Sequence, residues 1–249
     1  MASSQPYSVK CRDVNMMKSL QNDHMYAVPT DVSCFNKENP AMVRELQVRG
    51  VFSENCYFYI DQHTGSGFIV DPGAQAGLIY DVVVRNNWHI EKILLTHGHF
   101  DHLGAAELLG EKFAVPIYVY PSDARYLTDT FLNLSGNYGE GITIPHYEEL
   151  YDGEIIGLKA NSGFTLMVIH TPGHTPGSVT YYSPDEKVAF VGDTLYEHGI
   201  GLTNFPGGNR GEIMRSVVDK ILALPDDTIL LSGHSSPISV RDQRRILLG

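Results

Sequence analysis

One short segment of the chain is dense in side chains that bind transition metals. Residues 96–102 read T-H-G-H-F-D-H and so hold three histidines and one aspartate. Neutral imidazole and carboxylate groups are ligands that zinc, iron and manganese accept. An accidental run of solvated histidines rarely reaches this density, so the segment predicts a metal-dependent enzyme.

This segment lies between a predicted strand and a predicted helix. The apolar run at residues 92–95 is typical of a buried strand, and the apolar spacing of residues 103–113 predicts a helix. In an extended loop His97 and His99 project to the same side, because side chains two residues apart share a face. The aspartate and the last histidine of the segment, at the start of the predicted helix, can face a second point close to the first. One segment could therefore serve two adjacent metal sites.

Three further segments show a strand followed by a tight turn with one ligand-type residue. The predicted strands cover residues 164–169, 187–191 and 228–231, and the residues in the turns after them are His174, Asp193 and His234. Loops at one edge of a rigid sheet are a common way to assemble a catalytic site. We therefore expect these three side chains to meet the histidine-rich segment at one edge.

The combined pattern resembles the signature of the metallo-β-lactamase-fold hydrolases, and most of all their glyoxalase II-like (hydroxyacylglutathione hydrolase-like) branch. The motifs that carry the resemblance are H-x-H-x-D-H, T-P-G-H-T-P-G, G-D-T-L and a terminal G-H, supported by N-C-Y, V-D-P-G and F-P-G-G. They extend from about residue 45 to the C-terminus. The resemblance implies an α+β protein with the four-layer αββα sandwich of this fold.

The resemblance also implies a centre of two divalent transition metals, with zinc as first choice and iron or manganese as alternatives. The first metal would take His97, His99 and His174, the second would take Asp101, His102 and His234, and Asp193 would bridge them. All seven positions of the family pattern are filled in this sequence.

Other polar residues near the motifs are expected to have different roles. Asp71, in V-D-P-G, is expected to orient the histidine-rich loop rather than bind metal. His146 and His198 are expected at the surface, although His198 follows Asp193 closely enough to touch a substrate. His170 is expected at a strand end.

The remaining segments indicate one hydrolase domain with an extension. Residues 1–43 are polar and aperiodic, so we expect an N-terminal extension before a domain of residues 44–249 that begins with a strand at 45–52. Residues 79–88 and 211–224 have helical periodicity. Residues 127–151 are rich in Gly and Asn and predict an irregular loop, which by the resemblance would form a lid or wall near the metals.

Composition narrows the class of protein. No apolar run has transmembrane length and the first residues do not resemble a signal peptide, so we expect a cytoplasmic protein with no membrane partner. The three cysteines, Cys11, Cys34 and Cys56, are expected to be free thiols, with Cys56 in the core. A net charge of −11 argues against nucleic acid as partner. Self-association is compatible with the sequence, which fixes no subunit count.

Two adjacent metals favour hydrolysis of a small acyl compound. Metal binding lowers the pKa of water from 15.7 toward about 7, so a metal-bridging hydroxide could act as the nucleophile. Asp101 is the candidate catalytic residue, because it would bind metal and also orient this hydroxide. A thiolate leaves with little protonation, which makes a thioester the first choice of substrate.

Several alternatives remain open from the sequence. A lactonase or carboxylester hydrolase of the same fold is the second choice, and a persulfide dioxygenase with a single iron is the third. A β-lactamase is disfavoured because the pattern lacks a Cys-bearing site. A non-catalytic binding module is also disfavoured, because binding alone does not require a complete set of seven metal ligands. G-L-T-N-F at residues 201–205 stands where related sequences carry G-R-T-D-F. The change either removes an internal ion pair or alters the contacts to a substrate such as S-D-lactoylglutathione.

Overall fold

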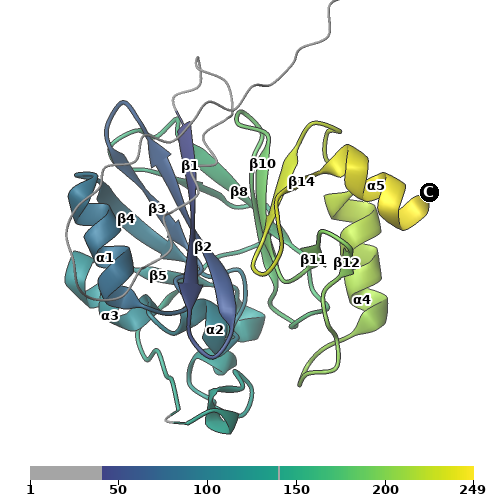
Figure 1. The fold of residues 1–249 in the computed structure, drawn as a ribbon, viewed down its shortest axis with the longest axis horizontal. Helices are drawn as coiled ribbons and strands as arrows, with labels where there is room; N and C mark the ends of the chain where they lie inside the picture. The colour runs from purple at the N-terminus through teal and green to yellow at the C-terminus, as the bar shows by residue number, and fades with distance from the viewer. Residues whose placement is uncertain (1–40, 140) are drawn as a thin grey trace, which may run out of the picture.

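The computed structural model describes residues 41–139 and 141–249, in which two β-sheets pack face to face between two layers of helices (Figure 1). The layer order is helix, sheet, sheet, helix, which confirms the predicted four-layer αββα sandwich and the α+β class. Residues 41–43 belong to the first strand, and the rest of the predicted N-terminal extension lies outside the described residues. In the described ranges no helix is long and apolar enough to cross a membrane.

The first sheet has the order β1-β2-β3-β4-β5-β6. Its strands are β1 (Ala41–Arg49), β2 (Ser53–Asp61), β3 (Ser66–Val70), β4 (His89–Leu94), β5 (Ile117–Val119) and β6 (Glu148–Glu149). The helices α1 (Ala76–Arg85) and α3 (Ala106–Phe113) cover its outer face, where Ile79 and Leu109 join the same buried cluster as Phe58 and Ile69. Burial of one apolar stripe per helix holds this layer on the sheet.

The second sheet has the order β14-β13-β10-β9-β8-β7. Its strands are β7 (Ile155–Gly157), β8 (Thr165–His170), β9 (Val179–Ser183), β10 (Val188–Gly192), β13 (Ile229–Ser232) and β14 (Ile238–Ser239). Its outer face is covered by α4 (Arg210–Arg215), η3 (Ser216–Ile221) and α5 (Val240–Leu248). A short hairpin of β11 (Leu195–Tyr196) and β12 (Gly199–Ile200) follows β10.

Buried tyrosines connect the two sheets through their hydroxyl groups. Tyr57 in β2 donates to the carbonyl of Ser232 at 2.7 Å, and Tyr59 donates to Ser183 Oγ at 2.9 Å. In the opposite direction Tyr181 of β9 donates to the carbonyl of Leu95 at 2.7 Å. Each hydroxyl is satisfied while its ring fills the apolar layer, so the two sheets are held in one relative position.

Parallel strand pairs determine where the functional segments emerge. In the first sheet β3 and β4 run parallel, so Asp71 and residues 96–102 leave the sheet at the same edge. In the second sheet β10 and β13 run parallel, and Asp193 and His234 follow their carboxyl ends. Sites outside the carboxyl ends of parallel strands are a recurrent location for ligands.

The predicted strands are present with bounds shifted by a few residues. Those predicted at 45–52, 92–95, 164–169, 187–191 and 228–231 are β1, β4, β8, β10 and β13. The helix predicted over 79–88 is α1, which begins and ends earlier. Cys56 is buried in the core as expected, whereas Cys11 and Cys34 lie outside the described residues.

The helix predicted over residues 103–113 is α3, which begins later, at Ala106. A separate short helix, α2 (Phe100–Leu103), precedes it, and the chain between the two is held by the V-D-P-G loop. The Ala105 N–H donates to the carbonyl of Pro72 at 2.9 Å, and a Cβ on Gly104 would lie 2.4 Å from the carbonyl oxygen of Gly73. Similarly, the helix predicted over 211–224 widens to a π-helical turn in η3.

Candidate metal centre

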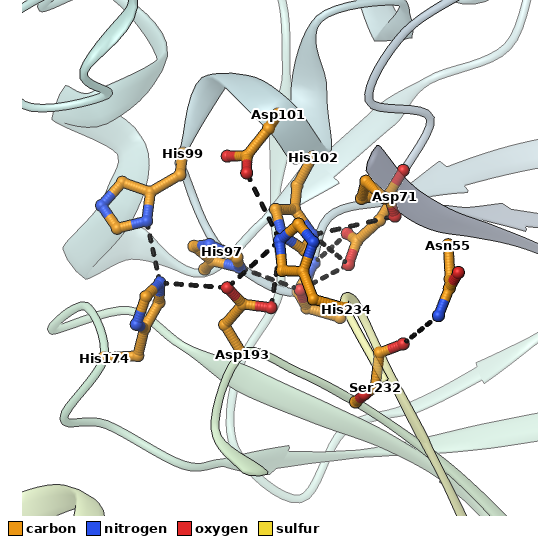
Figure 2. Close-up of polar contacts among 12 residues, drawn as sticks. Asn55, Asp71, His97, His99, Asp101, His102, His174, Asp193, Ser232 and His234 are labelled. Carbon is orange, nitrogen blue, oxygen red and sulfur yellow. Dashed lines mark hydrogen bonds and ion pairs between the residues drawn. The ribbon is translucent and has the colours of Figure 1, made fainter. Parts of the chain in front are cut away.

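The structure brings together all seven residues that the sequence nominated as ligands. They come from the loops after β4, β8, β10 and β13 and converge between the two sheets, as Figure 2 shows. The seven are His97, His99, Asp101, His102, His174, Asp193 and His234. Their donor atoms form overlapping groups whose members lie within 4.8 Å of one another.

The first group consists of His97, His99 and His174. The Nδ1 atom of His99 lies 2.9 Å from Nε2 of His174, and Nε2 of His97 is buried without a hydrogen-bond partner among the described residues. A buried ring nitrogen without a partner is unfavourable unless another species satisfies it. A transition metal would satisfy it, so this group fits one metal with three imidazole ligands.

The second group consists of Asp101, His102 and His234. The Nε2 atom of His234 lies 3.3 Å from Oδ2 of Asp101 and 3.3 Å from Nε2 of His102. This set of two imidazoles and one carboxylate is also a transition-metal donor set. The chain therefore fits a second metal beside the first.

Asp193 contacts both groups. Its Oδ2 atom lies 3.6 Å from Nε2 of His174 and 3.5 Å from Nε2 of His234, while Oδ1 lies 3.4 Å from Nε2 of His102. Oδ1 has no hydrogen-bond partner in the described part of the chain although it is buried. A carboxylate that contacts both groups is in the position of the bridging ligand that the resemblance implies.

The histidines of the first group are held neutral by their surroundings. Burial, with the neighbouring imidazoles, holds the pKa of His97 well below its usual range and lowers the pKa of His99 to about 3. Burial also lowers the pKa of His174, although Asp193 opposes it. Metals bind neutral imidazole, so these three side chains are in the form that a metal requires.

His102 and Asp193 form a buried charge pair in the protein alone. Burial by itself lowers the pKa of His102, but the carboxylates of Asp193 and Asp71 outweigh it and raise that pKa well above its ordinary value. Burial likewise opposes ionisation of Asp193, but His102 holds its pKa well below the ordinary value. The Asp193 carboxylate is thus ionised and can bind a cation. A metal that binds His102 would displace the proton from its ring.

Hydrogen bonds behind the ligands fix the orientation of their rings. His174 Nδ1 lies 2.7 Å from the carbonyl oxygen of Leu202, and His234 Nδ1 lies 2.7 Å from that of Ser53. A carbonyl can only accept, so each Nδ1 carries the hydrogen and each Nε2 presents its lone pair to the centre.

Asp71 has the orienting position predicted for it. Its Oδ1 atom accepts from the Thr96 N–H at 2.7 Å, and its Oδ2 atom accepts from Thr96 Oγ1 at 2.6 Å and faces His102 Nδ1 at 3.0 Å. One carboxylate thus fixes the start of the histidine-rich loop and the tautomer of His102.

Asp123, which no sequence motif identified, ties two ligand loops together. Its buried carboxylate accepts from the N–H groups of Gly98 at 2.8 Å and Gly177 at 2.7 Å, and from Thr175 Oγ1 at 2.6 Å. Burial raises the pKa of Asp123 to about 6. The close approach at Gly98 and Gly177 is a signal in the sequence, but neither glycine identifies its partner.

Glu54, beside the N-C-Y motif, is a second residue near the ligands that no sequence motif identified. Both carboxylate oxygens are buried without a hydrogen-bond partner among the described residues, and Oε1 lies 4.0 Å from His102 Nδ1. Burial raises the pKa of Glu54 well above its ordinary value. Because it faces Nδ1, Glu54 lies behind His102 and away from the Nε2 atom that faces the other ligands.

A pocket of about 410 Å³ adjoins the two groups. Its lining comprises Phe52, Ser53, His99, Phe100, Asp101, Leu134, Tyr138, His174, Asp193, Tyr196, Leu202, Phe205 and His234. Leu134 and Tyr138 belong to residues 127–151, so this segment forms a wall of the pocket as expected. Tyr196 donates from its hydroxyl to Asp193 Oδ2 at 2.7 Å.

The histidines expected outside the centre are outside it. The His198 side chain is 81% exposed and does not line the pocket, and His146 is exposed beside α3. His170 ends β8 and its Nε2 atom lies 2.8 Å from the carbonyl oxygen of Pro176.

Comparison with known proteins identifies relatives over most of the chain. Residues 49–234 match the family model of the Metallo-beta-lactamase superfamily. The chain is 36% identical over 204 residues to the probable metallo-hydrolase YqgX of Bacillus subtilis, covering 80% of this chain and 95% of YqgX. It is 32% identical over 201 residues to hydroxyacylglutathione hydrolase GloC of Haemophilus influenzae, covering 78% of this chain and 91% of GloC.

Solved structures give the same fold. The BLEG-1 B3 metallo-beta-lactamase superposes with a TM-score of 0.77 at 34% identity, over 82% of this chain and 97% of that one. TTHA1623 in a di-iron-bound form superposes with a TM-score of 0.72 at 27% identity, over 81% of this chain and 97% of that one.

Proposed function

Because the chain belongs to the metallo-β-lactamase superfamily, we propose that it is a dinuclear metal-dependent hydrolase of thioesters. The observation that carries the dinuclear part is the position of Asp193, whose Oδ2 atom lies 3.6 Å from His174 Nε2 and 3.5 Å from His234 Nε2. A carboxylate that contacts both ligand groups is suited to hold two metals a short distance apart.

The side chains have separate tasks in this proposal. His97, His99 and His174 would hold the first metal, and Asp101, His102 and His234 would hold the second, with Asp193 shared by both sets. Two divalent metals at these positions would supply an acidified water and an electrophile for the carbonyl oxygen of the substrate. Asp101 both lines the pocket and faces His234, so it can orient the attacking water. Water adds across the acyl–sulfur bond, and the products are a carboxylic acid and a thiol.

The choice of a thioester rests on the scarcity of proton donors in the pocket. Tyr196 lines the pocket, and its hydroxyl already donates to Asp193 Oδ2 at 2.7 Å. A hydroxyl whose hydrogen is held by a carboxylate is poorly placed to protonate a leaving alkoxide, whereas a thiolate leaves without protonation. The similarity to hydroxyacylglutathione hydrolase GloC supports the same choice.

A specific observation also favours a second candidate, β-lactam hydrolysis. The chain is 34% identical to a structure named a B3 metallo-beta-lactamase and spans 97% of it. β-Lactams therefore belong in the test beside thioesters, lactones and carboxylesters.

The test is a substrate panel on protein prepared free of metal and then loaded with zinc, iron or manganese. We expect hydrolysis of a thioester to exceed that of the oxygen ester with the same acyl group, because the alkoxide leaves poorly. A chelator should abolish this activity, and added metal should restore it. Faster hydrolysis of the oxygen ester, a lactone or a β-lactam would contradict the thioester assignment.

A further inference from the structure

The pocket next to the ligands has an aromatic wall, formed by Phe52, Phe100 and Tyr138. The ring centroids are 5.9 Å apart for Phe52 and Phe100, 5.4 Å for Phe52 and Tyr138, and 5.1 Å for Phe100 and Tyr138. All three side chains line the pocket. They come from the β1–β2 turn, the start of α2 and the segment 127–151, so three distant segments build one apolar surface.

The aromatic wall is connected directly to the ligand residues. Phe100 lies between His99 and Asp101 in the sequence, and the carbonyl of Ser53, the residue after Phe52, holds His234 at 2.7 Å. A group resting on the wall therefore lies beside the reacting centre rather than on a remote surface.

The described residues cover the aromatic wall only in part. Phe52 is 45% exposed and Tyr138 is 50% exposed, although both side chains line the pocket. Exposed apolar side chains grouped around a concave site indicate a ligand that covers them, because ligand pockets are mostly apolar with a few polar groups at the reacting end.

The pocket continues as an apolar surface beside the first ligand group. The Leu202 side chain is 54% exposed and lines the pocket, while its carbonyl holds His174 Nδ1 at 2.7 Å. Phe205 packs edge-on against His99, with ring centroids 5.5 Å apart. The second side of the pocket is thus apolar as well.

The charged residues that line the pocket also favour an apolar ligand. Among the described residues, the lining contains the carboxylates of Asp101 and Asp193 but no lysine or arginine. Substrates that carry carboxylates, such as glutathione thioesters, are usually recognised by cationic side chains with charge-assisted hydrogen bonds. The lining offers apolar contact in their place.

We propose that the substrate is an uncharged hydrophobic thioester whose alkyl or aryl group lies against the aromatic wall and Leu202. This inference rests on the proposed thioester hydrolysis and adds the class of substrate. Apolar contact beside the ligands then supplies the selectivity, and a negatively charged thiol carrier is not required.

The experiment measures kcat/KM of the metal-loaded protein on matched uncharged thioesters. S-ethyl thioacetate is compared with S-ethyl thiohexanoate and with S-hexyl thioacetate, which lengthen the acyl and the thiol side without a large change in leaving-group acidity. Lengthening at least one side should raise kcat/KM by about tenfold or more, the selectivity that added methylenes give in an apolar pocket. S-acetylglutathione should be no better than S-acetyl-N-acetylcysteamine, its uncharged counterpart.

Substitutions in the pocket lining test which side chains cause the rise in kcat/KM on lengthening. Phe52→Ala and Tyr138→Ala should each lower the ratio of kcat/KM for the lengthened thioester to kcat/KM for S-ethyl thioacetate and so remove most of the gain from lengthening. Phe131→Ala is the matched control, because Phe131 is 67% exposed in the same segment as Tyr138 but does not line the pocket. Leu202→Arg should lower the preference for hexyl groups and raise activity on S-acetylglutathione relative to its uncharged counterpart.

A measurement without turnover separates binding from chemistry. In the ketone analogue of S-hexyl thioacetate a methylene replaces sulfur, and calorimetry should show weaker binding of it to Phe52→Ala than to Phe131→Ala. If no thioester is hydrolysed, the proposed function fails and the inference fails with it. If thioesters are hydrolysed but neither side gains from lengthening, or if S-acetylglutathione is preferred by tenfold, only the inference is overturned.

Discussion

The buried carboxylate of Asp123 accepts a hydrogen bond from the backbone N–H of Gly98 at 2.8 Å. Gly98 separates the two histidines of the T-H-G-H segment, and the same carboxylate accepts from Thr175, the residue after His174. One side chain thereby fixes the spacing of the loops that carry the first ligand group. It does so without contacting the ligands themselves.

We predict that Asp123→Asn weakens binding of the first metal by about 10- to 100-fold, as for other residues that orient metal ligands. The amide nitrogen that replaces one oxygen cannot accept from the donors around it. Competition with a chromophoric chelator measures the affinity. Asp219→Asn, an exposed substitution on η3, is the control. Equal metal affinities of the two variants would contradict the positioning role.

The same residue should make stability depend on pH. Burial raises the pKa of folded Asp123 to about 6 from 3.8. The folded state therefore binds this proton more tightly than the unfolded state does. Protonation of Asp123 stabilises the folded state fully below about pH 4, and this stabilisation is lost as pH rises through about 6. The difference in free energy of unfolding between Asp123→Asn and the parent should therefore change by about 3 kcal/mol across this window. Denaturant unfolding of the metal-free proteins from pH 4 to 7 measures it, and a constant difference would refute the raised pKa.

Asp71→Ala should destabilise the metal-free protein by about 3 kcal/mol, because buried donors lose a charged acceptor. The donors are the N–H and hydroxyl of Thr96. Urea unfolding measures the change. Asp81→Ala is the control, since Asp81 forms an exposed ion pair with Arg85, a type that contributes about 0–1 kcal/mol. A loss for Asp71→Ala no larger than the control's would show that these hydrogen bonds do not hold the loop.

Asp193→Ala should impair both metal sites, whereas His234→Ala should mainly lower affinity at the second. Asp193 contacts both ligand groups, while His234 belongs to one. Elemental analysis after dialysis against a buffered metal gives the metal content per chain. Equal losses of a single metal from both variants are incompatible with a bridging role for Asp193.

The sequence predicts well which candidate ligands the folded chain brings together, because metal chemistry restricts residue type at each position. His97, His174 and Asp193 are identified by type and motif alone, and strand periodicity predicts that they meet at one edge. Asp123 could not be found this way, because its role depends on which loops approach it in the folded chain. The aromatic wall is hidden for the same reason, since Phe52 and Tyr138 are ordinary apolar residues in loops.

Local sequence patterns likewise predict some elements of the fold, whereas others depend on tertiary contacts. Apolar runs locate the main strands, whereas the αββα layers are expected from the resemblance to the metallo-β-lactamase fold. The break between α2 and α3 comes from a backbone hydrogen bond between Ala105 and Pro72, which no periodicity encodes. The π-helical turn of η3 is likewise set by packing, with Ser216 donating to the carbonyl of Pro172 at 2.7 Å.

In the proposed reaction two metals act together in thioester hydrolysis. Titration of the metal-free protein with zinc, followed through hydrolysis of S-hexyl thioacetate, tests this cooperation. We expect activity to rise until about two equivalents of zinc per chain are bound and then to stay constant. A plateau at one equivalent would contradict the dinuclear centre, and no hydrolysis at any zinc level would contradict the proposed function.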